Sequence, residues 1–276
     1  MLTLTTLSEN SANRKGLLAE HGLSILVEYG DYSILFDTGQ GISAVLNAEK
    51  MDINLQNISD IALSHGHYDH TGGLKHILEK SGPKNIYNHP DSLVAKYRKL
   101  ENNDYKPMGL PYTVSELKVL GANFILNRQP VELCPGMILT GEIPRKVSFE
   151  PTAEGHVILE GGKYRRDFLL DDQAIVINTS SGIVVLLGCS HAGIINTLNY
   201  ARDLTGSDKI HAVIGGTHLI EANSERLELT IKALKNMHIK KIAVSHCTGF
   251  KAQMALKQAF GDDFILNNCG HIIHIN

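Results

Sequence analysis

Short apolar runs alternate along the chain with segments of helical spacing, and this pattern predicts an α/β protein. Residues 2–7 and 24–37 have the character of strands, and the second range predicts a hairpin that turns at Gly30 and Asp31. A second hairpin is predicted at 173–188. Further strands are predicted at 57–65 and 85–90, with helices at 42–51 and 72–82.

A polar stretch interrupts this regular pattern between about residues 91 and 144. Its spacing is loose, and the run KLENNDYKPMGLP has the composition of an exposed loop. We therefore predict one domain over residues 1–276, with an insertion at about 91–144.

One local unit occurs four times: an apolar strand ends in a small residue and a histidine, and a helix then begins. The histidines are His65, His191, His218 and His246. Functional residues of α/β folds collect at the carboxyl ends of strands. If these strands lie in packed sheets, the four histidines can face one crevice. A single histidine of this kind could belong to the core, but four in the same context are less easily explained by chance.

Composition narrows the function classes. The chain has 276 residues, 43% hydrophobic and 20% charged, and its net charge of −3 gives no general attraction to nucleic acid or anionic membranes. No apolar run is long enough to span a membrane, and the N-terminus lacks a secretory pattern, so we predict a cytoplasmic location. Four widely spaced cysteines do not form a disulfide framework. The 14 histidines indicate a metal, with a solvated surface as the alternative.

The segment ALSHGHYDHTGGL, residues 62–74, concentrates this chemistry. Side chains at i and i+2 of an extended segment share a face, so His65 and His67 can bind one metal ion. Asp69 and His70 follow the turn and can bind at a second position, while the glycines at 66, 72 and 73 ease the bend and the close approach of backbone. Neutral imidazoles and a carboxylate suit zinc, iron or manganese. The alternative is a helix start capped by Asp69 with exposed histidines.

The motif SHGHYDHTGG resembles the HxHxDH signature of the metallo-β-lactamase superfamily, and LFDTG upstream resembles it too. TGEIPR, GCSHAG, GGTHL and SHCTG are similar to a narrower subgroup, named after 7,8-dihydropterin-6-yl-methyl-4-(β-D-ribofuranosyl)aminobenzene-5′-phosphate synthase. The resemblance implies an αβ/βα four-layer sandwich in which two mixed β-sheets are flanked by helices, with the metals at one edge.

The same resemblance implies a set of metal ligands. His65, His67 and His191 would hold a first metal, and Asp69, His70 and His246 a second. One or two divalent transition metals are therefore implied, with zinc favoured and iron or manganese also allowed.

The sequence departs from the superfamily at the bridging ligand. An aspartate commonly follows a strand of the second half, but this chain has Gly188, Cys189, Ser190 and His191 there, with no carboxylate. Either Cys189 supplies a thiolate, or His191 takes the position, or the bridge is missing. A buried structural cysteine is an equal alternative for Cys189.

Other polar residues have two explanations each. Asp37 is predicted to orient a ligating imidazole, with a plain turn aspartate as the alternative. His218 is predicted to contact substrate or to donate a proton, unless it only hydrogen-bonds backbone at the start of a helix. Cys247 is expected only to shape the turn after His246. Asp171 and Asp172 are explained by turn and solvation roles.

The functional hypothesis is a metal-dependent, hydrolase-like enzyme that uses metal-activated hydroxide on a small phosphorylated or pterin-like substrate. Asp69 and His218 are the candidate catalytic residues. A di-iron oxidoreductase on the same fold, or a binding or regulatory protein that keeps metal without turnover, are the alternatives. The predicted partner is a small-molecule substrate, with no nucleic acid and no membrane, and a homo-oligomer is compatible with the sequence.

Overall fold

The computed structural model describes residues 1–276, which divide into two compact units. Unit 1 consists of Met1–Arg128, Ala153–Asp171 and Asn268–His274. Unit 2 consists of Gln129–Thr152, Asp172–Asn267 and Ile275–Asn276. The organisation as a single domain stays a prediction.

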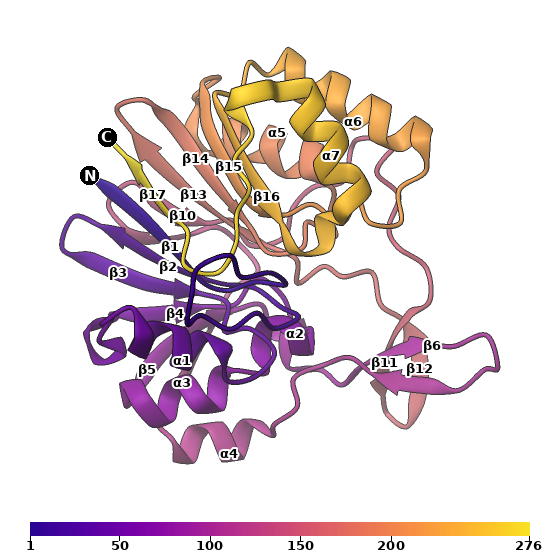
Figure 1. Cartoon of the computed structure of the whole chain (residues 1–276). Helices are drawn as coiled ribbons and strands as arrows, with labels where there is room; N and C mark the ends of the chain where they lie inside the picture. Colours follow the sequence, from indigo (N-terminus) through magenta and orange to yellow (C-terminus); the bar gives the residue numbers. More distant parts are fainter. The chain divides into compact units, whose positions relative to one another are not determined.

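Unit 1 is built on a seven-stranded mixed sheet (Figure 1). Its order is β17-β1-β2-β3-β4-β5-β8. The hairpin of β2 and β3 is antiparallel and turns where the sequence predicts, whereas β3, β4, β5 and β8 run parallel. The strands are β1 (Leu2–Ser8), β2 (Ser24–Tyr29), β3 (Tyr32–Phe36), β4 (Asp60–Ala62), β5 (Lys84–Asn88), β8 (Ala122–Leu126) and β17 (Ile272–Ile275).

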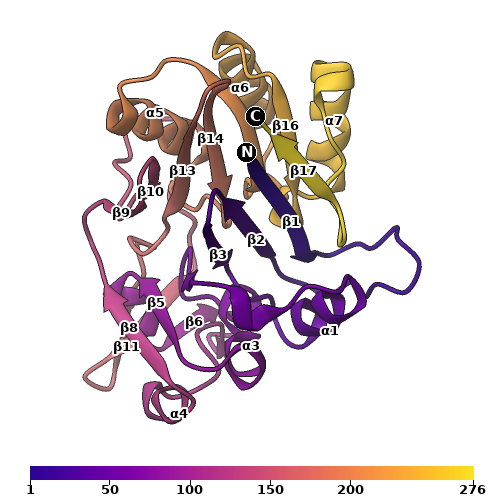
Figure 2. The ribbon, with the colours of Figure 1, turned by 90° about the vertical axis from the view of Figure 1, so that its left-hand side faces the viewer.

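Helices cover a face of this sheet (Figure 2). The apolar side chains of α1 and α3 pack in one cluster with buried residues of β2, β3, β4 and β5, because the spacing of these side chains places them on one side of each helix. Gly82 ends α3, as predicted. The helices of unit 1 are α1 (Ser43–Lys50), α2 (Tyr68–Thr71), α3 (Leu74–Ser81) and α4 (Val114–Val119), with short 3-10 helices η1 (Leu55–Asn57) and η2 (Pro90–Leu93).

A four-stranded antiparallel sheet, which the sequence does not predict, also belongs to unit 1. Its order is β12-β11-β6-β7, and the rings of Tyr105 and Tyr164 stack on it with their centroids 3.6 Å apart. The predicted insertion thus contains regular structure: β6 and β7 form half of this sheet, and β8 extends the larger one. The strands are β6 (Lys96–Lys99), β7 (Tyr105–Pro107), β11 (His156–Glu160) and β12 (Lys163–Arg166).

Unit 2 is built on a six-stranded mixed sheet in the order β16-β15-β14-β13-β10-β9. The strands β14, β15 and β16 are parallel, with one register shift between Ile183 and Val184, so their carboxyl ends lie at one edge. Apolar side chains of all three helices, α5, α6 and α7, join the strands in one core. The elements are β9 (Val131–Cys134), β10 (Met137–Leu139), β13 (Ala174–Thr179), β14 (Gly182–Leu187), α5 (Ile194–Thr205), β15 (Ile210–Gly216), α6 (Ser224–Asn236), β16 (Lys241–Ser245), η3 (His246–Thr248), α7 (Phe250–Phe260) and η4 (Gly261–Asp263).

These elements confirm the α/β class and the two mixed sheets with flanking helices. None of the helices combines the length and the apolar character that crossing a membrane requires.

The glycines of the motif at 62–74 permit close backbone contacts, as the sequence predicts. A Cβ atom added to Gly66 would lie 2.4 Å from the carbonyl oxygen of Ser92, and one added to Gly73 would lie 2.0 Å from that of Thr38. Neither glycine has a positive φ. The requirement at these positions is therefore space, not backbone conformation.

We predict that Gly73→Ala destabilises the protein by about 3 kcal/mol or more, since the backbone of Thr38 cannot move without disturbing the end of β3. Gly161→Ala is the control: Gly161 has φ of +57°, but a Cβ atom added there would meet no atom within 4 Å, so about 1 kcal/mol is expected. Urea unfolding of both variants measures the difference. Equal losses would show that the contact at Gly73 is not tight.

Candidate metal centre

The HxHxDH segment of unit 1 turns directly from β4 into α2. His67 has an extended backbone with φ of −75° and ψ of 148°, and α2 begins at the next residue. The rings of His65 and His67 are buried, and Nε2 of His65 lies 3.0 Å from Nδ1 of His67. Because residues i and i+2 of an extended segment share a face, these two nitrogen atoms lie close enough together to serve as a pair of metal-ligand atoms.

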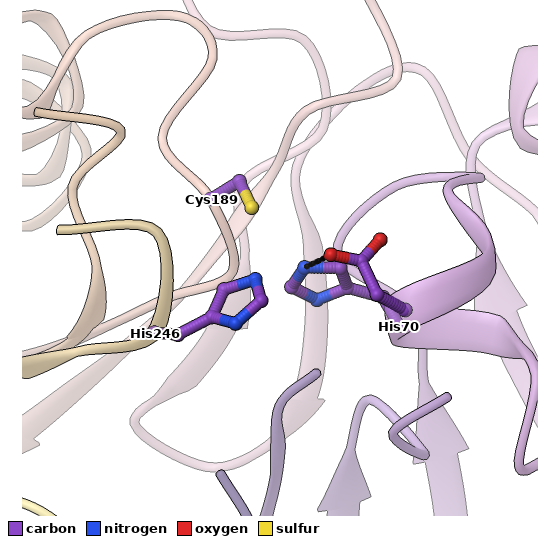
Figure 3. Close-up of side chains that lie close together, drawn as sticks. His70, Cys189 and His246 are labelled. Atoms are coloured by element: carbon purple, nitrogen blue, oxygen red, sulfur yellow. Dashed lines mark ion pairs between the residues drawn. The ribbon is translucent and has the colours of Figure 1, made fainter. Parts of the chain in front are cut away.

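Asp69 and His70 both lie in α2, beyond the turn. Oδ2 of Asp69 is 3.8 Å from Nε2 of His70, which is labelled in Figure 3. The same oxygen is 3.3 Å from Nε2 of His21, whose side chain is 53% exposed. No sequence pattern singles out His21, because it belongs to none of the strand–histidine–helix units.

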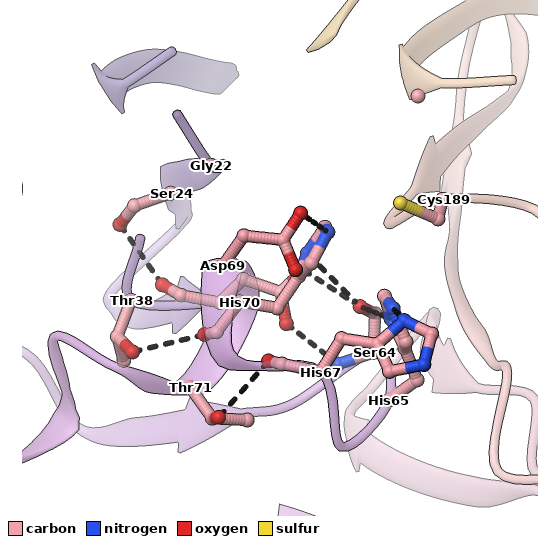
Figure 4. A network of polar contacts seen from close by, with 12 residues as sticks. Gly22, Ser24, Thr38, Ser64, His65, His67, Asp69, His70, Thr71 and Cys189 are labelled. Carbon is pink, nitrogen blue, oxygen red and sulfur yellow. Dashed lines mark hydrogen bonds and ion pairs between the residues drawn. The ribbon is translucent and has the colours of Figure 1, made fainter. Parts of the chain in front are cut away.

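The carboxylate of Asp37 orients two of these imidazoles through hydrogen bonds. Figure 4 shows Ser64 close to His65 and His70. Nδ1 of His70 donates to Oδ2 of Asp37 at 2.7 Å, and Ser64 donates to the same carboxylate through its backbone N–H and its hydroxyl, each at 2.7 Å. Because the Ser64 hydroxyl donates to Asp37, it accepts from Nδ1 of His65 at 2.9 Å. The predicted orienting role of Asp37 is confirmed for His70, and it extends to His65 through Ser64.

Burial keeps the motif histidines neutral. Desolvation by burial lowers the pKa of His65 well below its ordinary value, and neighbouring His70 and His67 lower it further. Burial also lowers the pKa of His67 to about 3, despite the opposing charge of Asp69. An imidazole must be neutral to bind a metal, so these two side chains are in the ligating state at physiological pH.

The predicted solvation role of Asp171 and Asp172 is wrong, because both side chains are buried, although Asp171 does lie in a turn. In unit 1, Oδ2 of Asp171 accepts from the backbone N–H of Gly66 at 2.8 Å. In unit 2, Oδ2 of Asp172 accepts from the backbone N–H of Ala192 at 2.8 Å. Their position before a strand gives no signal of burial, which follows from tertiary contacts alone.

Unit 2 gathers its own set of donors after β14, β15 and β16. The sulfur of Cys189 lies within 4.8 Å of a ring nitrogen of His191 and also of one of His246. Figure 3 shows Cys189 and His246, which come from the loops after β14 and β16. The rings of His191 and His218 meet edge to face with their centroids 4.4 Å apart. The predicted meeting of histidines at strand ends is therefore observed within this unit.

Several loops at the strand ends adopt left-handed backbone conformations. Asp37 follows β3 in unit 1 with φ of +60°. In unit 2, the values of φ are +56° for Ser190, +47° for His218 and +55° for His246. Such angles are uncommon for residues other than glycine and cost about 1 kcal/mol each or more, and they cluster at functional sites. The sequence does not reveal them, since none of these residues is glycine.

Cys247 ties the three strand ends of unit 2 together. Its sulfur accepts from the backbone N–H of His218 at 3.3 Å, and its thiol donates to the carbonyl oxygen of Cys189 at 3.6 Å. Shaping the turn after His246 was the predicted role, and the structure extends it to the loops after β14 and β15.

A cavity of about 690 Å³ lies in unit 2, next to the loop after β15. It begins three residues beyond His218 and reaches the first two turns of α6. Its lining combines one arginine, two glutamates and apolar side chains, including Phe149 and Arg226. Its volume is in the range of small-molecule sites.

Comparison with known proteins identifies the family. The model of the metallo-beta-lactamase superfamily matches residues 18–169. The chain is 37% identical over 285 aligned residues to 7,8-dihydropterin-6-methyl-4-(beta-D-ribofuranosyl)-aminobenzene-5′-phosphate synthase of Methanocaldococcus jannaschii, covering 99% of this chain and 96% of that protein. It is 32% identical to a second, uncharacterized protein of the same organism, MJ0448, over 98% of each chain.

A solved structure agrees with these matches. Tm1679, a metal-dependent hydrolase of the beta-lactamase superfamily, has a TM-score of 0.86 and 29% identity, covering 100% of this chain and 99% of that one. These matches confirm the predicted fold class. The chain therefore belongs to the metallo-β-lactamase superfamily.

Proposed function

We propose that this chain is a metal-dependent enzyme that acts on a small phosphorylated or pterin-like molecule. The proposed metal ligands are His65, His67, Asp69 and His70 in unit 1, together with His191 and His246 in unit 2. The metals are one or two divalent transition ions, with zinc favoured and iron or manganese also allowed.

The observation that carries this proposal is the donor pair of His65 and His67. Their facing nitrogens lie 3.0 Å apart in a buried position, and burial keeps both rings neutral. Asp37 and Ser64 hold the Nδ1 side of His65 and His70, so Nε2 of each ring is the atom that would face a metal. Borderline nitrogen donors beside a carboxylate suit a transition metal better than magnesium or calcium.

A bound divalent ion would supply a Lewis acid and bring the pKa of water close to neutrality. We propose that Asp69 accepts a proton, since its side chain is 10% exposed and lies beside His70 and His21. His218 is the proposed proton donor to the substrate. Its strained backbone and its edge-to-face contact with His191 hold the ring in place.

The relative from Methanocaldococcus jannaschii bears on the substrate. Its name denotes a product that joins a dihydropterin-6-methyl group to a ribofuranosylaminobenzene 5′-phosphate. Identity of 37% over nearly the whole length of both chains supports substrates of the same class for this chain.

The purified protein should contain one to two equivalents of transition metal by elemental analysis, and His67→Ala should contain less. Two assays then define the reaction. One offers phosphodiester, thioester and lactone substrates, and the other offers a dihydropterin with a leaving group on its 6-methyl carbon plus ribofuranosylaminobenzene 5′-phosphate. Detection by mass spectrometry of the product that joins the two substrates would establish a synthase. Detection of a product formed by hydrolysis would establish a hydrolase. Metal-loaded protein inactive in both assays would contradict the proposed substrate class.

We predict that Asp37→Asn weakens metal binding by about 10- to 100-fold. The amide has one acceptor oxygen in place of two and a donating NH2 group, so it loses either the bond from the Ser64 N–H to Oδ1 or the two bonds from the Ser64 hydroxyl and His70 to Oδ2. Competition with a chromophoric chelator measures the affinity. Ser24→Ala is the matched control, because the Ser24 hydroxyl bonds the backbone carbonyl of Asp37 and not its carboxylate, and this variant should retain wild-type affinity.

The buried thiol of Cys189 is the second test of the ligand set. We expect Cys189→Ser to keep its metals and to lose only modest stability, because a small buried cysteine suits a tight turn against a helix; a loss of about tenfold in metal affinity that Cys189→Asp restores would instead show a thiolate ligand. Cys247→Ser is the control: its sulfur bonds backbone groups, so only stability should fall. Full metal content in Cys189→Ser, measured at limiting metal concentration, would show that Cys189 is only a packing residue.

A further inference from the structure

We propose that Asp171, supported by Lys96, is a positioning residue that fixes the backbone of Gly66 between the metal-ligand candidates His65 and His67. This inference rests on the proposed metal site. It assigns a specific role to a buried ion network in unit 1, formed by Lys96 of β6 and by Asp167 and Asp171, which follow β12.

The network consists of one lysine and two aspartates, all in unit 1. Nζ of Lys96 donates to Oδ2 of Asp167 at 2.6 Å and to Oδ1 of Asp171 at 3.0 Å. The side chains of Lys96 and Asp171 are 1% and 0% exposed. The second oxygen of Asp171 accepts from Gly66 N–H at 2.8 Å. The carboxylate of Asp171 therefore joins the lysine to the turn of the metal motif.

The same region contacts the motif at two further points. The backbone N–H of Tyr68, which begins α2, donates to the carbonyl oxygen of Met108 at 2.8 Å, and the N–H of Met108 donates to the carbonyl oxygen of Lys96 at 2.9 Å. Gly66 packs against the backbone of Ser92 so closely that a side chain would not fit. The segment from Ser92 to Met108 thus holds the motif through its backbone, and Lys96 and Asp171 add the charged contact.

The stability of the fold does not by itself explain why Lys96, Asp167 and Asp171 are buried together. Burying three charges costs several kcal/mol per ion before their attraction is counted, and apolar replacements of such clusters are often neutral or stabilising. Burial would raise the pKa of Asp171, but the charge of Lys96 lowers it below its ordinary value, so the carboxylate stays ionised. An ionised acceptor makes a shorter, stronger hydrogen bond to a backbone N–H than a neutral one. The arrangement therefore favours a fixed Gly66.

The test compares the variants Asp171→Asn and Asp167→Asn. Both aspartates bond Lys96, but they bond different backbone N–H groups. Asp171 accepts from Lys96 and Gly66, and Asp167 accepts from Lys96 and from the backbone N–H of Leu169 at 2.8 Å. Asparagine has one acceptor oxygen, so each variant must give up one of its two bonds. Each variant loses or weakens the bond to Lys96 or the bond to a backbone N–H, and only in Asp171→Asn is that N–H part of the metal motif.

We expect Asp171→Asn to lower zinc affinity at least tenfold, measured on the full chain by competition with a chromophoric chelator, while Asp167→Asn changes it less than threefold. The absorption spectrum of the cobalt-substituted protein should change in Asp171→Asn only, because it reports ligand geometry and not stability. Chemical unfolding of the metal-free proteins should give similar midpoints for the two variants.

Leu117→Ala, which opens the α4 side of the core, serves as a variant of reduced stability with an intact network. Its zinc affinity should equal that of the wild type. Equal affinity losses in Asp171→Asn and Asp167→Asn, or an unchanged cobalt spectrum in Asp171→Asn, would overturn the positioning role. A wild-type protein without zinc affinity would instead defeat the proposed metal site itself.

Discussion

The contacts of the Asp37 carboxylate hold the first half of the candidate site together. This side chain is fully buried and receives three hydrogen bonds, from two groups of Ser64 and from the His70 ring. It stands at the end of β3, Ser64 follows β4, and His70 lies in α2. One residue thus joins three elements, and a buried carboxylate is stable only when its oxygens are bonded in this way. The orientation of the imidazoles depends on it.

In unit 1 the carboxylate of Asp37 orients the candidate site residues, whereas in unit 2 strained backbone conformations orient them. Three parallel strands end at one edge, and each is followed by a loop with a residue in the left-handed region. These conformations persist because the strands beneath them are fully buried and cannot move, and because the thiol of Cys247 links the loops. The packing of the sheet therefore stabilises the strained backbone conformations of Ser190, His218 and His246.

One group of buried charges in this protein supports the motif. The ammonium of Lys96 lies between two carboxylates, which raise its pKa above the ordinary value although burial alone would lower it. The exposed ion pair of Lys80 and Glu49 contributes little by comparison, since water screens it. The small sheet that carries Lys96 is thus part of the support of the metal motif, in a segment whose polar sequence indicates only an exposed insertion.

The sequence alone determined the elements and the main ligand candidates, because both are local. Alternating and helical spacing specify β2, β3 and α3 directly, and HxHxDH places four donor residues within six positions. Only the tertiary structure decided the role of Asp171, the approach of His21 to Asp69 and the link from Cys247 to Cys189. These contacts join residues far apart in the chain, and no local pattern distinguishes a buried acceptor from a solvated turn residue. Burial and hydrogen bonding across the fold make that distinction.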